Sequence, residues 1–209
     1  MRCDRRDVDL RRLRQCSHLE NRHPATVTEM PTTLFLARHG ETDWNRDRRI
    51  QGHSDVPLND DGRGQARALA RRLESESLDA VYASDLARAR ETAEIAAAAQ
   101  GLPVTEIGDL RERHFGTWEG LTDDDVRLRF PEARTGPWGD GETPEEMSAR
   151  VLGAVLAIAA AHAGGRVLVV THGGPIRAAL RSCGVEPESI ENCAVTRIEV
   201  EDAELRWID

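Results

Sequence analysis

Two segments of the sequence place a histidine directly after an apolar run. The run LFLA leads into Arg38 and His39, and the run VLVV leads into Thr171, His172 and two glycines. Ligands of open α/β sheets bind beyond the carboxyl ends of the strands, so the two imidazoles are predicted to meet over one site. Glycine lets the backbone approach a ligand closely, and a helix that starts there offers free N–H groups to an anion. The alternative for each histidine alone is a hydrogen-bonded structural residue at a strand end.

Two charged side chains between these segments suit phosphate chemistry. Ser84 ends a strand-like run, and Arg88 follows one turn into the next helix. Arginine has fixed, permanently charged donors that match phosphate oxygens, and Glu112, just after another strand-like segment, can serve as a proton donor. The alternatives are that Arg88 forms surface ion pairs with acidic neighbours and that Glu112 is a solvated loop carboxylate.

These residues need a sheet to position them. Apolar strand-like runs alternate with helical patterns from residue 33 onward, which is typical of an α/β domain around a mostly parallel sheet. The unbroken VLVV run suits a strand that is covered on both faces. The predicted strands are 33–37, 80–83, 104–107, 166–170, and a pair at 195–200 and 204–208.

Helical periodicity and capping signals fill the intervening segments. One apolar stripe is formed by residues 66, 69, 70 and 73, and another by residues 147, 151, 155 and 158. Thr143 with Glu146 makes a capping box for the second helix. The acidic run at 123–125 resembles a metal site, but its position after Thr122 favours a helix N-cap and first turn. We therefore predict no metal site and no cofactor.

Composition limits the classes of partner. The formal net charge of the 209 residues is -9, which argues against a general nucleic-acid binder. No apolar stretch approaches the length of a membrane span, so we expect no membrane partner and a cytoplasmic protein. The four cysteines lack metal-ligand spacing and are predicted to be free thiols. Residues 1–30 are rich in charge and poor in apolar periodicity, which predicts a disordered extension before a domain at 31–209.

The motifs together resemble the histidine phosphatase superfamily, also called the phosphoglycerate-mutase-like family. The resemblance covers 33–208 and implies a three-layer α/β/α sandwich around a mostly parallel sheet with one antiparallel strand. It also implies a small phosphorylated metabolite as substrate and a monomer or homodimer. The matching motifs are RHGETDWN, RRIQGHSDVPLNDDG, SDLARARETA, LRERHFGTWEG and THGGPIR.

The resemblance also implies a role for each matched residue. His39 would be the nucleophile that becomes phosphohistidine, with a ring nitrogen oriented by a backbone carbonyl, and Glu112 would be the proton donor. The phosphoryl oxygens would be surrounded by Arg38, Arg88 and His172, with further contacts from Asn45, Gln51 and Gly173. A metaphosphate-like transition state needs charge stabilisation above all, which arginine and protonated histidine can supply.

Two other functions compete with a phosphatase. A cofactor-dependent phosphoglycerate mutase shares the nucleophile, but mutases of this family have a longer segment between the acid and the second histidine and an extended C-terminal tail. Here Glu112 and His172 are 60 residues apart and the chain stops soon after the final strand, which favours hydrolysis. A catalytically dead binding module would be expected to lose the nucleophile or an essential arginine, and both are present.

Overall fold

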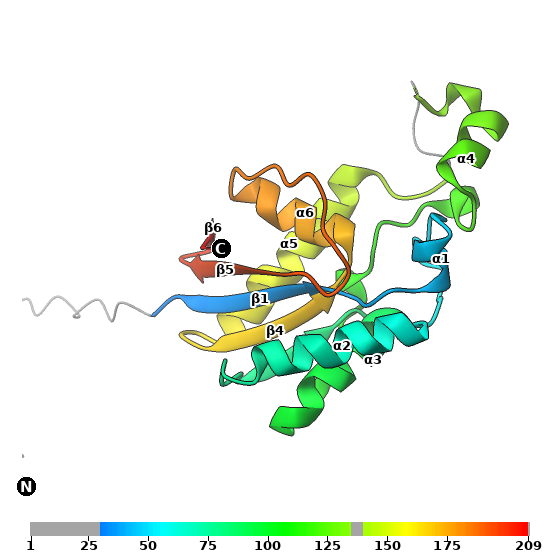
Figure 1. The fold of residues 1–209 in the computed structure, drawn as a ribbon. Coiled ribbons are helices and arrows are strands. Elements are labelled where there is room, and N and C mark those ends of the chain that lie inside the picture. The colour runs from blue at the N-terminus through cyan, green and yellow to red at the C-terminus, as the bar shows by residue number, and fades with distance from the viewer. Residues whose placement is uncertain (1–29, 135–139, 209) are drawn as a thin grey trace, which may run out of the picture.

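The protein is built on one six-stranded sheet. A computed structural model describes residues 30–134 and 140–208, and the strands lie in the order β3-β2-β4-β1-β5-β6 (Figure 1). The predicted extension at 1–30 lies outside the described residues apart from residue 30. The strands are β1 (Thr32–Arg38), β2 (Ala80–Ala83), β3 (Val104–Glu106), β4 (Arg166–Thr171), β5 (Val195–Glu201) and β6 (Glu204–Trp207).

Strand directions confirm the predicted fold class. Strands β3, β2, β4 and β1 are parallel to one another. Strand β5 is antiparallel to β1, and β6 is antiparallel to β5. The register sets Arg38 of β1 opposite Thr171 of β4. His39 and His172 therefore leave adjacent parallel strands at the same level of the sheet.

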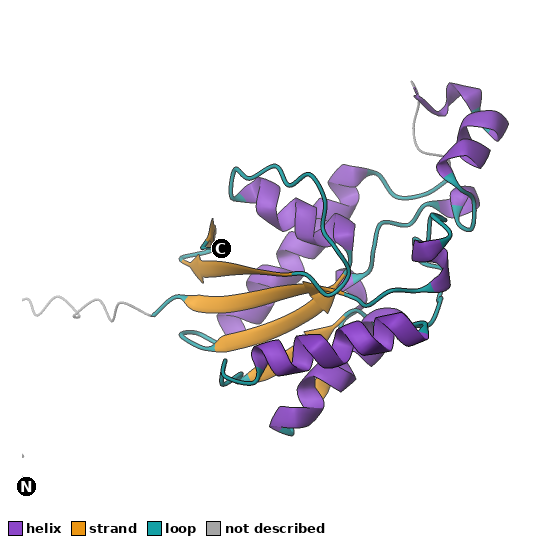
Figure 2. Ribbon diagram, in the orientation of Figure 1, coloured by secondary structure: helices purple, strands orange, loops and turns teal. Residues whose placement is uncertain are grey.

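Helices cover both faces of the sheet and complete the three layers (Figure 2). Helices α5 and α6 pack on one face, while α2 and α3 pack on the other. The side chains of β4 alternate between the two cores, and all of Val167–Val170 are 0% exposed, as the VLVV run predicts. The helices are α1 (Asp43–Arg46), α2 (Asp60–Leu73), α3 (Ala87–Ala97), α4 (Asp123–Arg129), α5 (Pro144–Ala161) and α6 (Gly173–Ser182), with 3₁₀ turns η2 (Ala98–Gln100), η3 (Gly108–Leu110), η4 (Gly116–Trp118) and η5 (Pro131–Arg134).

The predicted capping box at Thr143 and the predicted N-cap at Thr122 are both present. The hydroxyl of Thr143 accepts from the Glu146 N–H at the start of α5, and Thr122 caps α4 in the same way through Asp125. The acidic run at 123–125 is thus the first turn of α4, where carboxylates interact favourably with the helix dipole. Helix α4 lies on an arm that projects from the body (Figure 1). None of the helices described here is long and apolar enough to span a bilayer.

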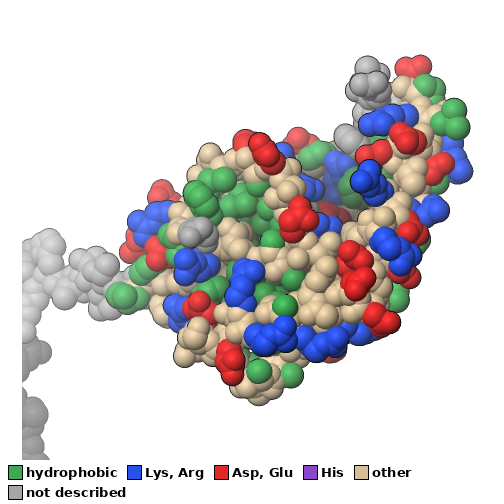
Figure 3. Space-filling model, viewed as in Figure 1, with side chains coloured by type: hydrophobic (Ala, Val, Ile, Leu, Met, Phe, Trp, Pro, Cys, Tyr) green, Lys and Arg blue, Asp and Glu red, His purple; other side chains and the backbone are tan. Residues whose placement is uncertain are grey.

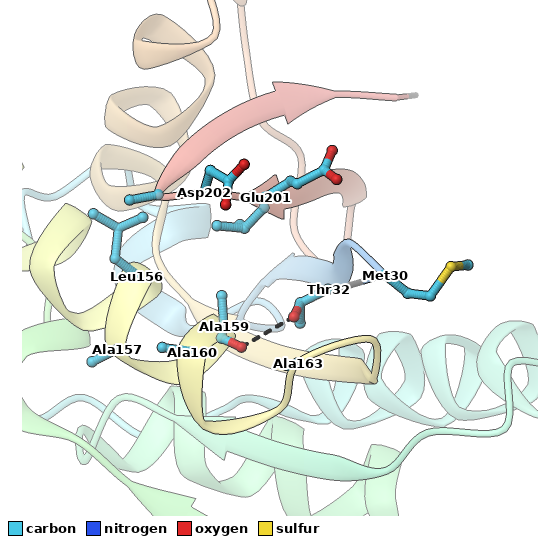
Figure 4. A pocket seen from close by; sticks show the side chains of 11 residues that line it. Met30, Thr32, Leu156, Ala157, Ala159, Ala160, Ala163, Glu201 and Asp202 are labelled. Carbon is cyan, nitrogen blue, oxygen red and sulfur yellow. Dashed lines mark hydrogen bonds between the residues drawn. The ribbon is translucent and has the colours of Figure 1, made fainter. Parts of the chain in front are cut away.

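The amino end of the sheet holds a pocket of about 440 Å³ that is lined mainly by apolar residues, together with Glu201 and Asp202 (Figure 4). Its walls come from the start of β1, the end of α5 and the β5–β6 turn. Thr32 is the buried polar residue at its edge, and the Thr32 hydroxyl lies 3.0 Å from the carbonyl oxygens of both Ala159 and His162. The polar group at this end of β1 is therefore fully satisfied by the protein.

Candidate active site

The rings of His39 and His172 lie against each other at the carboxyl ends of β1 and β4. Their centroids are 5.0 Å apart, and the residues are only 3% and 0% exposed. The parallel register of the two strands causes this proximity, because each histidine is the first residue after its strand.

The His39 ring is oriented by its neighbouring backbone. Its Nδ1 lies 2.7 Å from the carbonyl oxygen of Gly40, so Nδ1 carries the proton and Nε2 keeps its lone pair. Gly40 is itself fixed, because its N–H donates to the Thr92 hydroxyl at 3.0 Å. A Cβ at Gly40 would lie 2.6 Å from the carbonyl oxygen of Gly62 in α2, so only glycine allows this approach. The carbonyl contact expected from the family resemblance is present.

Burial and nearby cations keep His39 neutral. Burial, followed by the charges of Arg88 and Arg38, lowers the pKa of His39 well below its usual range, against the opposing effect of the Gly40 hydrogen bond. A neutral imidazole with a free Nε2 lone pair is a nucleophile at neutral pH.

His172 differs from the expectation of a protonated imidazole. Its Nε2 lies 2.9 Å from the Ser84 hydroxyl, and its buried Nδ1 has no hydrogen-bond partner among the described residues. Burial and then the Arg88 charge lower the pKa of His172 well below its usual range, so the ring is neutral in the anion-free protein. A dianionic phosphoryl group beside it would oppose that shift, because an opposite charge favours the protonated form.

Arg88 is the largest fully buried side chain and supplies fixed positive charge. Its guanidinium donates to the carbonyl oxygens of Gly52 at 2.7 Å and Ser54 at 2.8 Å. Burial lowers its pKa to about 10, which still leaves it charged at neutral pH. The 52–54 loop is held by the Glu119 carboxylate, which accepts hydrogen bonds from the N–H groups of His53 and Ser54. The alternative of a surface ion pair for Arg88 is therefore wrong.

Arg38, which is partly buried, supplies the second cation. Its Nη1 donates to the Ile190 carbonyl oxygen at 2.6 Å, whereas its buried Nε has no partner in the part of the chain that the structure describes. Burial lowers the pKa of Arg38, and the nearby Glu112 carboxylate opposes that shift. Arg38 and Arg88 both lower the pKa values of the two histidines, so all four side chains share one electrostatic environment.

The Glu112 carboxylate lies beside the first turn of α6, next to the histidines and arginines of the site. One carboxylate oxygen accepts from the Gly174 N–H at 3.0 Å and the other from the Arg113 N–H at 2.9 Å. A Cβ at Gly174 would lie 2.1 Å from Glu112 Oε1, the oxygen that accepts from Arg113, so any larger residue at 174 would displace the carboxylate. Burial lowers the pKa values of Arg38 and Arg88, and the Glu112 charge opposes this lowering for both. The carboxylate therefore lies near both cations.

The backbone of Glu112 is clamped by Arg150 of α5. The Arg150 guanidinium donates to the carbonyl oxygens of Arg111 and Glu112, each at 2.8 Å, and its orientation is fixed by an ion pair with Glu142. The His53 ring adds a contact of 2.9 Å to the same Glu112 oxygen. These contacts hold the segment that presents the carboxylate.

Three predicted ligand residues remain. Asn45 lies in α1, Gln51 lies in the loop after α1, and Gly173 lies at the start of α6. Thr42 links two of them, because its hydroxyl donates to Gln51 Oε1 at 2.9 Å and its N–H donates to Asn45 Oδ1 at 3.2 Å. With both amide oxygens engaged, the amide NH₂ groups of Asn45 and Gln51 remain donors for an anion. Gly173 is the first residue of α6, so its N–H has no partner within the helix.

Several residues that build the site escaped the sequence prediction. Thr42, Glu119, Arg150 and Asn192 all hold site residues; the Asn192 amide donates to the His39 carbonyl oxygen at 2.9 Å. Only the capping pattern of Thr42 with Asn45 gave a local signal. The other three act on backbone carbonyl groups or loops far away in sequence, which no motif reports.

Among the residues that the structure describes, no group of three or more His, Cys, Asp or Glu side chains could hold a metal ion. The positive charge in the site comes from Arg38 and Arg88.

Comparison with known proteins identifies the family of this chain. The model of the histidine phosphatase superfamily, branch 1, matches residues 34–208. The chain is 42% identical over 179 residues to phosphoglycerate mutase-like protein 4 of Arabidopsis thaliana, covering 80% of this chain and 77% of the relative. It is 42% identical over 158 residues to a metal-independent phosphoserine phosphatase of the same plant, covering 70% and 66%. A mycobacterial glucosyl-3-phosphoglycerate phosphatase solved with VO₃ superposes with a TM-score of 0.76 at 30% identity, covering 84% and 96%.

Proposed function

Because the chain belongs to the histidine phosphatase superfamily, we propose that it is a metal-independent phosphomonoester hydrolase that acts on a small phosphorylated metabolite through a phosphohistidine at His39. The observation that carries the proposal is the pair of buried imidazoles 5.0 Å apart, next to the guanidinium groups of Arg88, which is buried, and Arg38, which is partly buried. Membership alone leaves both hydrolysis and phosphoryl return to a substrate open, since both phosphatases and a mutase-like protein are among the relatives.

In the first step, His39 Nε2 attacks phosphorus while the bond from phosphorus to the ester oxygen breaks. Glu112 gives its proton to the departing oxygen, which leaves as an alcohol. The transferring group has metaphosphate character, so its charge needs fixed donors more than covalent help. Arg38, Arg88 and the Gly173 N–H supply these donors, and His172 joins them as the anion favours its protonated form.

In the second step, water replaces the alcohol. The Glu112 carboxylate accepts a proton from this water as its oxygen attacks phosphorus, and the phosphorus–nitrogen bond to His39 breaks. Inorganic phosphate is released and Glu112 is protonated again for the next turnover. The same carboxylate therefore acts as acid and then as base, and its two hydrogen bonds to backbone N–H groups hold it in one place for both roles.

The test is a comparison of two reactions on the same preparation. Phosphate release is measured with O-phosphoserine, 3-phosphoglycerate and p-nitrophenyl phosphate, with and without EDTA. Conversion of 3-phosphoglycerate to 2-phosphoglycerate is measured in the presence of the bisphosphate. We expect phosphate release that EDTA does not change and that is absent in His39→Ala. Rapid isomerisation with negligible release would assign the chain to the mutases instead.

A further inference from the structure

Arg177 of α6 lies beside the active site. Helical side chains point toward the N-terminus of their helix, so residue 177 covers the turn at Gly173. A Cβ built on Gly173 would lie 3.5 Å from Arg177 Nη1, which places the guanidinium over the first turn of α6. The side chain is half-buried, and it makes no hydrogen bond or ion pair within residues 30–134 and 140–208.

Arg177 acts electrostatically on two other arginines, Arg38 and Arg113. Burial is the main cause of the lowered pKa values of both, and the Arg177 charge lowers both further. Arg113 is 9% exposed, and its guanidinium lies 4.3 Å from the centroid of the Phe115 ring. In a chain with a net charge of -9, three guanidinium groups gathered around one carboxylate form a local cationic region. Figure 3 shows a hollow between the body and the arm that carries α4, with basic side chains in it.

The order of these groups follows the expected path of a substrate. Arg38 and Arg88 lie with His39, where the phosphoryl group is transferred, and Glu112 comes next, where the ester oxygen departs. The start of α6 joins Arg177 to this path, since Gly173 and Gly174 are adjacent and Gly174 contacts Glu112. Arg113 directly follows Glu112 in the chain. Arg177 and Arg113 therefore both lie near Glu112, where the ester oxygen would depart.

Resting on the proposed function, we propose that Arg177, supported by Arg113, binds a carboxylate carried by the leaving group, so that the preferred substrates are phosphomonoesters of short hydroxy acids. A carboxylate is planar and accepts two parallel hydrogen bonds from a guanidinium. It must lie within a few bonds of the ester oxygen, because Arg177 and Arg113 border the residue that protonates that oxygen. The names of two relatives, a phosphoserine phosphatase and a glucosyl-3-phosphoglycerate phosphatase, describe substrates with such a carboxylate.

The test compares substrates that differ at the carboxylate alone. Glycerol 3-phosphate has a hydroxymethyl group where 3-phosphoglycerate has its carboxylate, at the same distance from the ester. We expect wild-type kcat/KM to favour 3-phosphoglycerate by about tenfold or more, since a hydrogen bond to a charged group is typically worth that much. Arg177→Gln is expected to lower this preference by about 10- to 100-fold, mainly through KM, while Arg177→Lys retains part of it.

The matched control is Arg181→Gln, one turn further along α6. Arg181 is exposed and pairs with Glu186, so this change is expected to leave the preference intact. An equal loss on both substrates in Arg177→Gln, or no preference in wild type, would overturn the inference while the phosphatase function stands. Failure of wild type to release phosphate from p-nitrophenyl phosphate as well as from both esters would instead overturn the proposed function, and this inference with it.

Discussion

The two ends of β1 differ in how their buried polar groups are satisfied. At the amino end, the Thr32 hydroxyl is surrounded by carbonyl oxygens and the adjoining cavity is largely apolar. At the carboxyl end, His39, Arg88 and His172 are as deeply buried as the hydrophobic core. Among the described residues at that end, buried nitrogen atoms of Arg38, Arg88 and His172 lack a hydrogen-bond partner.

This difference supports the proposal that the carboxyl end of the sheet is where the phosphoryl group binds. Buried donors without partners cost stability, and they persist where a ligand satisfies them. The same strands therefore have one end that only stabilises the fold and another end that carries the reactive side chains. Changes at the carboxyl end should affect catalysis, whereas changes at the amino end should affect only stability.

Apart from loss of the nucleophile itself, the largest expected effect is that of Arg88→Gln on phosphate release. Removing one fixed donor to transition-state charge typically costs about 10²- to 10³-fold in kcat. Arg90→Gln, two residues along and more exposed, is the control and should lose less than about twofold. A similar loss in both variants would show that α3 as a whole, and not the Arg88 charge, matters.

Arg150→Met should give a smaller loss because Arg150 acts through the position of Glu112. A misplaced catalytic group can reduce turnover by about 10²-fold, so we expect a loss of about 10- to 100-fold in kcat with little change in KM. Arg150→Lys should recover part of the activity, and Arg129→Met on the projecting arm is the control. A change confined to thermal stability would remove the positioning role.

The pH dependence of stability should reveal the buried histidines. The pKa values of His39 and His172 are depressed by folding, so between the unfolded value near 6.5 and the lowered folded values the unfolded chain binds more protons. Stability therefore rises with pH in this window and is lost as pH falls below about 6.5. The slope is about 1.4 kcal/mol per pH unit for each proton. Urea unfolding between pH 7.5 and 5 should show a shallower slope for His172→Asn, and an unchanged slope would contradict the neutral imidazole.

Thr32→Val should have the smallest effect and none on catalysis. Loss of the hydroxyl removes a hydrogen bond to carbonyl oxygens at the amino end, at a cost of about 1 kcal/mol in the free energy of unfolding. Urea unfolding and phosphate release on the same preparation would test this. A large loss of activity in this variant would mean that the two ends of β1 are coupled.

The sequence predicts the sheet well because local patterns determine it. The alternation of strands and helices, the capping residues Thr122 and Thr143, and the buried VLVV run all follow from residues close together in the chain. The proximity of His39 and His172 was predictable once both were placed after parallel strands. The catalytic roles of the two histidines remain a prediction.

Other features of the site depend on contacts between distant residues. The neutral state of His172 follows from its burial beside Arg88, and neither the burial nor the distance can be read from the THGG motif. The Arg150 clamp joins residues about 40 positions apart through backbone carbonyl groups, which carry no sequence signature. The arrangement of Arg177 beside Gly173 likewise needs the helix geometry.

The central claim is that His39 carries the phosphoryl group during turnover, and rapid acid-free quenching tests it directly. Enzyme mixed with ³²P-labelled phosphoester is denatured at alkaline pH within the first turnover and digested for mass spectrometry. We predict an acid-labile, alkali-stable label on the peptide that contains His39, and no label in His39→Ala. Label on another residue, or full phosphate release by His39→Ala, would contradict the account.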